Sequence, residues 1–107
     1  MFTRIVHVTA KTGKGRELTT LANEKILPIL QSTPGFVDEI GLVSTDNPDR
    51  LVAISFWNSK EDAERYQREH FNKVNDLLKN VIVSPPVIET YAVDTSTVHK
   101  IAAGKAA

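Results

Sequence analysis

The stretch from Ile54 to Leu78 most constrains the fold, because a strand pattern runs directly into the start of an amphipathic helix. Ser59 and Asp62 stand at capping-box spacing, so the Ser59 hydroxyl can accept a hydrogen bond from the Asp62 backbone N–H. The Asp62 carboxylate also suits the positive end of the helix dipole. At 3.6 residues per turn, one helical face collects Ala63, Tyr66, His70, Phe71, Val74, Leu77, Leu78 and Val81. His70 is therefore predicted to lie within an apolar stripe.

Length and composition narrow the class of protein. A chain of 107 residues with 41% hydrophobic content indicates one domain around one core. Thirteen basic residues balance thirteen acidic ones, and no basic block interleaves with aromatic residues, which argues against nucleic-acid binding. The absence of cysteine excludes disulfides, thiolate metal sites and a cysteine nucleophile. Residues 1–9 resemble neither a signal peptide nor a membrane span, so we expect a cytoplasmic protein that does not contact membranes.

The remaining elements follow from turn residues and periodicity. Pro28 falls near the end of the first predicted helix, where it should remove one backbone hydrogen bond and bend the last turn. Strands are predicted over residues 2–10, 36–44, 51–57 and 87–93, with helices over 15–31 and 60–78. The order β-α-β-β-α-β predicts an α+β, ferredoxin-like fold: a four-stranded antiparallel sheet with both helices on one face. Residues 1–94 form this domain, and residues 95–107 form a tail that is flexible or packed on a dimer partner.

The strand over residues 51–57 indicates a second copy of the chain. Leu51, Ala53 and Trp57 fall on one face of this strand and Val52, Ile54 and Phe56 on the other, so both faces are apolar. Two helices can cover only one face of a four-stranded sheet. We therefore expect two chains to pack sheet to sheet as a twofold-symmetric homodimer with a barrel-like interior.

Several side chains could carry chemistry or could simply pack. His70 is the best candidate for a general base, since an unperturbed histidine titrates at a pKa of about 6.5, although it could equally be a buried packing residue. Trp57 and Tyr66 could line a substrate pocket or anchor the core. His7 shares a strand face with Thr3, Ile5 and Thr9, so it reaches either the pocket or the dimer interface. His99 lies in the tail and is expected to be solvated.

A metal site gains no support from the pattern of ligating residues. The histidines His7, His70 and His99 show no His-x-x-x-His pairing. The nearby carboxylates Glu69 and Asp76 point mainly to the opposite helical face from His70. We therefore expect no bound metal.

Two motifs and the order of elements carry a family resemblance. One motif is the Thr33-Pro34-Gly35-Phe36 link into the second strand, and the other is the junction Phe56-Trp57-Asn58-Ser59-Lys60-Glu61-Asp62-Ala63. Together they resemble the antibiotic biosynthesis monooxygenase (ABM) family over roughly residues 2 to 94. The resemblance implies a dimeric α/β-barrel of ferredoxin-like subunits, with a pocket between the helices and the sheet of each. It also implies oxidation of a small aromatic molecule by dioxygen without metal, flavin or haem.

The resemblance assigns roles to particular residues. Carried over by position, Trp57, Asn58 and Tyr66 would shape the pocket with His7 as a further substrate-binding candidate, and His70 would be the catalytic base. Such chemistry needs a base and a dry pocket, because dioxygen reacts with an electron-rich phenolate or enolate far faster than with a closed-shell neutral molecule.

Two other functions are compatible with a fold of this kind. A related branch degrades haem with an asparagine on the first strand and a tryptophan and histidine on the second helix. Residues 1–12 contain no asparagine and residues 60–78 no tryptophan, so haem degradation is disfavoured. The sequence thus predicts a cofactor-independent monooxygenase of a small electron-rich aromatic or quinol-like compound. The alternative is a noncatalytic dimeric module, ligand-binding or stress-related, in which the same residues only pack.

Overall fold

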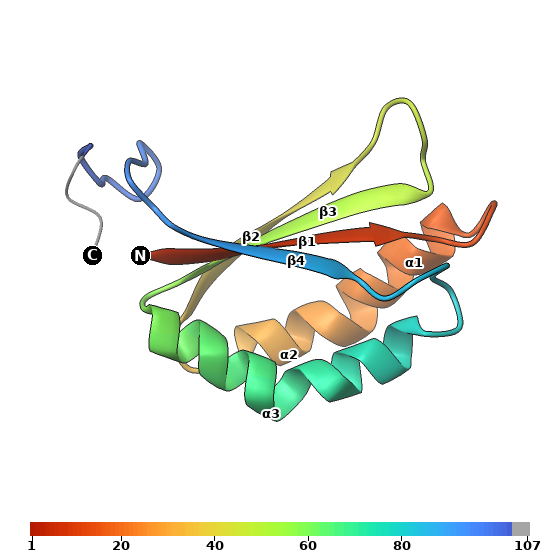
Figure 1. The fold of residues 1–107 in the computed structure, drawn as a ribbon, viewed down its shortest axis with the longest axis horizontal. Coiled ribbons are helices and arrows are strands. Elements are labelled where there is room, and N and C mark those ends of the chain that lie inside the picture. The colour runs from red at the N-terminus through yellow and green to blue at the C-terminus, as the bar shows by residue number, and fades with distance from the viewer. Residues whose placement is uncertain (104–107) are drawn as a thin grey trace.

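A four-stranded antiparallel sheet carries two helical segments on one face and leaves most of the other face open (Figure 1). The structure is a computed structural model and describes residues 1–103. Its elements are β1 (Phe2–Thr9), α1 (Gly15–Leu21), the π-helical turn η1 (Ala22–Ile26), α2 (Leu27–Gln31), β2 (Phe36–Val43), β3 (Arg50–Trp57), α3 (Lys60–Leu78) and β4 (Val87–Ala92). The strand order is β2-β3-β1-β4. The predicted ferredoxin-like fold is confirmed.

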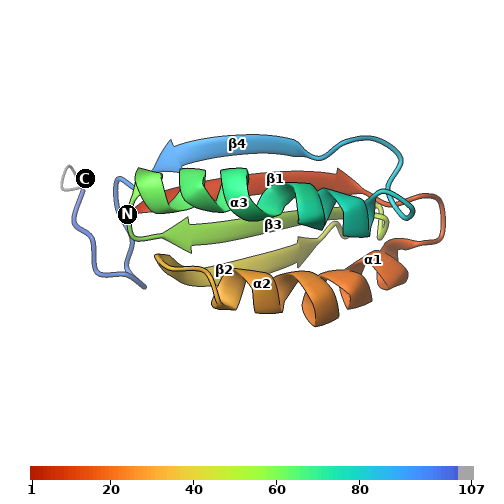
Figure 2. The same ribbon diagram turned by 90° about the horizontal axis from the view of Figure 1, so that it is seen from below.

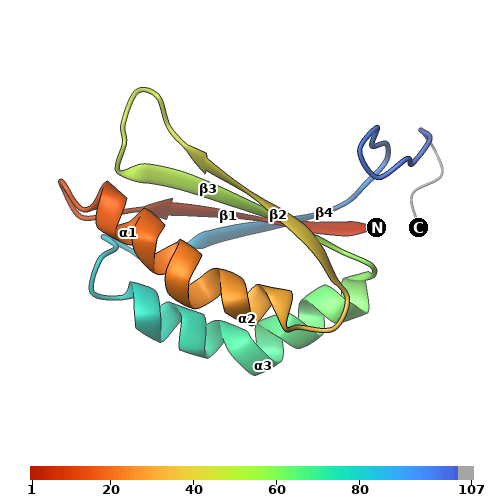
Figure 3. The same cartoon turned by 180° about the vertical axis from the view of Figure 1, so that it is seen from behind.

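The helices form one layer beneath the sheet. Figure 2 shows α3 running along the middle strands while α1, η1 and α2 run side by side with it beneath β2. The tip of the β2–β3 hairpin projects away from this helical layer (Figure 3). The largest fully buried side chains, Trp57, Tyr66 and Leu18, lie between the sheet and the helices.

The junction between β3 and α3 is built as the sequence predicts. The Asp62 backbone N–H donates to Ser59 Oγ over 3.2 Å, and the Ser59 hydroxyl donates to Asp62 Oδ2 over 2.9 Å. Gly35 packs against this cap with φ +86°, and a Cβ atom there would collide with the Asp62 side chain. The Gly35 carbonyl accepts from the Asn58 N–H over 2.8 Å, so the link before β2 is tied to the start of α3.

The first helical segment is irregular because of Pro28. Proline has no N–H and its ring clashes with the carbonyl four residues earlier, here that of Glu24. The structure accommodates this with a wide turn, in which the Leu27 N–H donates to the Ala22 carbonyl five residues back. The expected disturbance is therefore present, but it lies in the turn before Pro28 and not in the last turn of the helix.

The open face of the sheet carries exposed apolar side chains beside the polar residues Asp38 and Glu89. Strand alternation places Thr3, Ile5 and His7 on this face, opposite Arg4, which contacts the helices. Its exposed members include Ile40, Leu42, Val87 and Tyr91. The open face is thus the surface on which the sequence predicts a second copy, and His7 belongs to this face and not to the helix-covered one.

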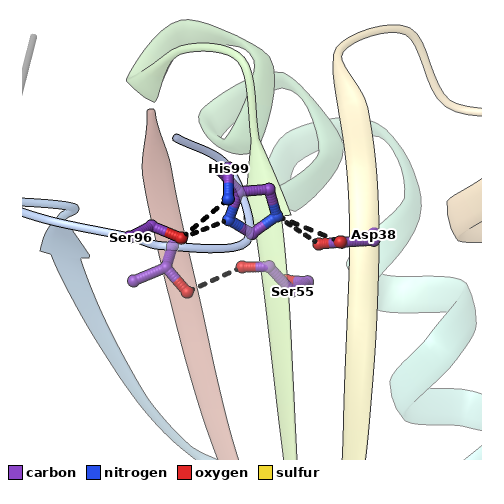
Figure 4. Close-up of polar contacts among 5 residues, drawn as sticks. Asp38, Ser55, Ser96 and His99 are labelled. Atoms are coloured by element: carbon purple, nitrogen blue, oxygen red, sulfur yellow. Dashed lines mark hydrogen bonds and ion pairs between the residues drawn. The ribbon is translucent and has the colours of Figure 1, made fainter. Parts of the chain in front are cut away.

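The C-terminal segment folds back onto one end of the open face. Ser96 and Ile101 pair as an isolated antiparallel bridge. The His99 ring packs 4.7 Å from the Phe56 ring, and its Nε2 lies 3.0 Å from Asp38 Oδ2 (Figure 4). The His99 side chain is only 10% exposed, so the expectation of a solvated His99 is wrong. The reason is that Phe56 offers an apolar surface that the imidazole covers. Part of the predicted tail, residues 104–107, lies outside the described residues.

Candidate functional site

A cavity of about 280 Å³ lies between the covered face of the sheet and the helices. Its lining is mainly aliphatic and aromatic, with Val6, Val8, Leu18, Ala22, Ile26, Leu30, Leu51, Ala53, Phe71, Val74 and Leu78 among its members. A cavity of about 150 Å³ is known to hold benzene, so this one has room for about two fused aromatic rings. It lies near the lower end of the range of about 300–1,000 Å³ for ligand pockets.

The hollow exists because one row of the sheet carries small side chains. Val6, Ala53 and Gly41 stand directly opposite one another on β1, β3 and β2. A Cβ atom added at Gly41 would meet nothing closer than Glu39 Oε1 at 3.4 Å. The space beside Gly41 and Ala53 is therefore free for a bound ligand. Two residue pairs further along the strands, Trp57 and Phe36 fill the corresponding space between the sheet and the helices.

A row of polar side chains crosses the wall of this cavity. Arg4 pairs with Ser55, and Ser55 pairs with Glu39, so all three project from the covered face in one line. Arg4 is 3% exposed and Ser55 5% exposed. All three line the cavity together with Tyr66 from α3. The cavity thus has a cation, a hydroxyl and a carboxylate on its sheet side, and Thr19 and Asn23 are polar lining residues from the first helical segment.

Arg4 is held by neutral groups. One guanidinium nitrogen donates to Gln67 Oε1, and the guanidinium carbon lies 5.0 Å from the Tyr66 ring centroid and 5.1 Å from that of Phe71. Burial lowers the pKa of Arg4, and Tyr66 acts in the opposite direction. Since arginine is not deprotonated in proteins, the side chain remains a cation at neutral pH.

Tyr66 and Glu39 are both shifted toward their neutral forms. Burial raises the pKa of the Tyr66 phenol, against a smaller opposing effect of Arg4, so Tyr66 is a hydrogen-bond donor at neutral pH. Partial burial also raises the pKa of Glu39. Glu39 is therefore a stronger proton acceptor than an exposed glutamate.

Of the five residues that the sequence predicts for the site, only Tyr66 lines the cavity. Trp57 is completely buried between Phe36 and Tyr66, and its indole N–H donates to Ser55 Oγ over 2.9 Å, so it is a core anchor. Asn58 is exposed.

Neither histidine of the predicted site reaches the chamber. His70 is half-buried with its ring 6.0 Å from the Tyr66 ring, at the flank of the stripe whose centre carries Tyr66, Phe71 and Val74. His7 lies on the open face, where its Nε2 is 2.7 Å from Glu89 Oε1. The structure therefore separates both imidazoles from the cavity that Tyr66 lines.

The sequence interpretation missed Arg4, Ser55 and Glu39. Their proximity depends on which strands are neighbours and in what register, which is not a local property of the sequence. A signal existed for Arg4 alone: it alternates with Phe2, Val6 and Val8 and so occupies a core-facing position of an apolar strand face.

Within the described part of the chain, no group of three or more histidine, aspartate or glutamate side chains is placed to hold a metal ion. A search of the same residues finds no helix with the length and apolar character needed to span a membrane.

Comparison with known proteins gives one family. The family model described as "Antibiotic biosynthesis monooxygenase" matches residues 1–76. No curated protein matches the sequence.

Solved structures share the fold at low sequence identity. SnoaB, a cofactor-independent oxygenase from Streptomyces nogalater, is 16% identical with a TM-score of 0.76, over 90% of this chain and 95% of that one. The monooxygenase from the gene ActVA-Orf6 of Streptomyces coelicolor, solved with the ligand nanaomycin D, is 17% identical with a TM-score of 0.76, over 89% and 88%. A conserved protein from Methanosarcina mazei Go1 is 22% identical with a TM-score of 0.70, over 85% and 91%.

Proposed function

The chain belongs to the antibiotic biosynthesis monooxygenase family, and on this premise we propose that it oxidises a small electron-rich aromatic or quinol-like compound with dioxygen, using no cofactor. The observation that carries the proposal is the apolar cavity of about 280 Å³ with a polar row along its wall. SnoaB, which has the same fold, is a cofactor-independent oxygenase, and the ActVA-Orf6 monooxygenase binds nanaomycin D.

The reaction needs nothing beyond substrate and dioxygen. When a methylene group between two aromatic or carbonyl carbons is oxidised, one oxygen atom becomes the new carbonyl and the other leaves as water with the two hydrogens. Dioxygen is a triplet, so it reacts slowly with a neutral closed-shell molecule, whereas an ionised phenol or enol can transfer one electron to it. The protein must therefore bind the substrate, favour its ionised form and exclude water.

Tyr66 is the residue that links the aromatic core to the cavity. Its ring packs 5.2 Å from Trp57 and 6.5 Å from Phe71, which fixes the side chain in place. A neutral phenol in this position can donate a hydrogen bond to an oxygen atom of the substrate. Trp57 then acts as a positioning residue that holds the Tyr66 ring, in place of the pocket-lining role that the sequence suggested.

Oxygen uptake is the direct test of the activity. Purified protein is incubated with naphthols, naphthohydroquinones and anthrones while dioxygen consumption and product formation are followed together. We expect one dioxygen per product with at least one of these compounds. Tyr66→Phe should lower kcat/KM about tenfold, because it removes one hydrogen bond to a charged oxygen and leaves the ring packing intact.

Uptake that is absent for the whole panel would favour the noncatalytic ligand-binding module. Uptake that is unchanged in Tyr66→Phe would show that the reaction takes place outside this cavity.

We also propose that two chains associate through the open face of the sheet and that the protein is cytoplasmic. Ile40 and Leu42 on this face are 48% and 46% exposed, and Tyr91 is 51% exposed. Large apolar side chains exposed together on one face are typical of a surface that another chain covers. Sedimentation at micromolar concentration should give a dimer, and a monomer under these conditions would contradict the proposed association.

A further inference from the structure

Arg4 is a buried cation without a counter-charge. Its guanidinium contacts Gln67, Tyr66 and Phe71, and no carboxylate in residues 1–103 forms an ion pair with it. Tyr66 and Phe71, on whose rings the guanidinium packs, both line the cavity. Buried charges in proteins are usually paired, since an isolated one loses its hydration without compensation. An anionic group at this end of the cavity would supply the missing partner.

Glu39 is a half-buried carboxylate without a donor. No group in residues 1–103 forms an ion pair or a hydrogen bond with its side chain. Its Oε1 atom lies 3.4 Å from the position of a Cβ atom at Gly41, so the carboxylate stands beside the open space of the cavity. Burial raises the pKa of Glu39, because the ionised form loses water and gains no partner. A hydroxyl group at this end of the cavity would donate the hydrogen bond that the carboxylate lacks.

The two charges stand at opposite ends of the polar row. Two strand spacings of about 4.8 Å separate the backbones of Arg4 and Glu39, so the two residues stand about 10 Å apart across the sheet. A carboxylate and a hydroxyl at opposite positions of one aromatic ring span about 10–11 Å when a hydrogen bond of about 2.8 Å is added at each end. The same two groups on adjacent ring carbons lie at one side of the ring and do not reach both residues.

We propose that the substrate of this cavity is a hydroxyaryl carboxylate of about two fused rings, whose carboxylate pairs with Arg4 while its hydroxyl, across one ring, donates to Glu39. Among the residues that line the cavity, these two carry charge. The carboxylate is already an anion at neutral pH, so its contact with Arg4 serves recognition and involves no proton transfer. The inference rests on the proposed function only in taking this cavity as the substrate site, and it narrows the substrate class named there.

The folded protein is prepared for such a ligand before binding. Folding alone desolvates Arg4, so only the carboxylate of the ligand loses water when the ion pair forms. The rings of Tyr66 and Phe71 hold the guanidinium in place, so little side-chain entropy is lost on binding. A guanidinium–carboxylate contact also consists of charge-assisted hydrogen bonds, which are stronger than neutral ones. The carboxylate should therefore contribute more affinity here than at an exposed arginine.

Equilibrium binding without dioxygen tests this two-ended recognition. Four naphthalene compounds of similar size are compared by calorimetry: 4-hydroxy-1-naphthoate, 2-hydroxy-1-naphthoate, 1-naphthoate and 1-naphthol. We expect 4-hydroxy-1-naphthoate to bind most tightly. Because 1-naphthoate lacks the hydroxyl and 1-naphthol lacks the carboxylate, each should bind about 10- to 100-fold more weakly, the scale of one hydrogen bond to a charged group. The isomer 2-hydroxy-1-naphthoate carries both groups on adjacent carbons and should bind no more tightly than 1-naphthoate.

Variants assign each end of the ligand to its residue. Arg4→Met removes the cation and should abolish the preference for 4-hydroxy-1-naphthoate over 1-naphthol, whereas Arg4→Lys keeps the charge and should retain part of it. Glu39→Met removes the acceptor and should abolish the preference for 4-hydroxy-1-naphthoate over 1-naphthoate. Glu69→Gln alters an exposed carboxylate of α3 and should change neither preference. Each preference is a ratio of two affinities in the same protein, so partial unfolding of a variant does not alter it.

The inference is overturned if none of the four compounds binds, or if any of the other three binds as tightly as 4-hydroxy-1-naphthoate. These outcomes need only the wild-type protein, so a misfolded variant cannot obscure them. Preferences that persist in Arg4→Met and Glu39→Met would also overturn it. Selective binding without oxygen uptake for any compound would contradict only the monooxygenase proposal. Uptake with naphthols or anthrones that is as efficient as with 4-hydroxy-1-naphthoate would contradict only the present inference.

Discussion

The covered face of the sheet has a solid end and a hollow end, and the two differ by a few side chains. At the solid end Trp57, Phe36 and Tyr66 pack ring to ring. At the hollow end Ala53 and Gly41 leave the sheet nearly bare, and a cavity of about 280 Å³ lies above them. Aromatic side chains thus fill the space between the sheet and the helices at one end, and their absence at the other end leaves room for a ligand.

Truncation at the solid end should have the largest effect on stability. Trp57→Ala removes a completely buried side chain and its hydrogen bond to Ser55, so we expect a loss of about 3–5 kcal/mol in the free energy of unfolding. Urea unfolding followed by circular dichroism measures this, with Trp57→Phe as a milder control. A loss below about 1 kcal/mol would mean that the solid end does not support the fold.

The hollow end should instead contain a group that weakens the fold. Burial raises the pKa of Glu39, so its contribution to stability is present below the unfolded-state pKa and is lost as the pH rises through the folded-state pKa. Glu39→Gln should therefore match the wild type in acid and exceed it at neutral pH. Unfolding at both pH values tests this, with exposed Glu69→Gln as the control. A Glu39→Gln protein that is less stable than wild type at neutral pH would contradict the assignment.

The smallest effect is expected at His70, which lies outside the hollow. Its ring packs near Tyr66 but does not line the cavity. His70→Ala should change kcat/KM by no more than about twofold, the scale of substitutions away from a site. Oxygen uptake with the same substrate panel measures it. A loss of a hundredfold or more would support the role of base that the sequence predicts for His70.

Most of the fold could be predicted because its signals are local. The Ser59 cap, the Pro28 irregularity and the glycine before β2 each depend on residues a few positions apart. The two-sided apolar pattern of β3 also predicted correctly that the sheet has a face its own helices do not cover. The solvation of His99 was predicted wrongly because its contact with Phe56 and Asp38 joins distant parts of the chain.

The site was harder to predict for the same physical reason. Tyr66 could be found because helical periodicity fixes its direction. Arg4 and Glu39 could not be brought together, since their row depends on strand order and on a register that the irregularity between Phe36 and Asp38 shifts. His70 looked equivalent to Tyr66 on a helical projection, yet the four-residue step between them turns the side chain by about 40° and moves His70 to the flank of the stripe.

The central claim is that the cavity beside Gly41 is the active site, and filling that cavity with a larger side chain is the most direct test. Gly41 has no positive φ and has room for a side chain, so Gly41→Val should fold as well as the wild type or better, by about 0.5–1 kcal/mol. Oxygen uptake and urea unfolding are measured on this variant and on Ile40→Val, whose side chain lies on the open face and does not line the cavity. We predict that Gly41→Val loses nearly all uptake while its stability is kept, and that Ile40→Val retains uptake. Full activity in a stable Gly41→Val protein would contradict the account.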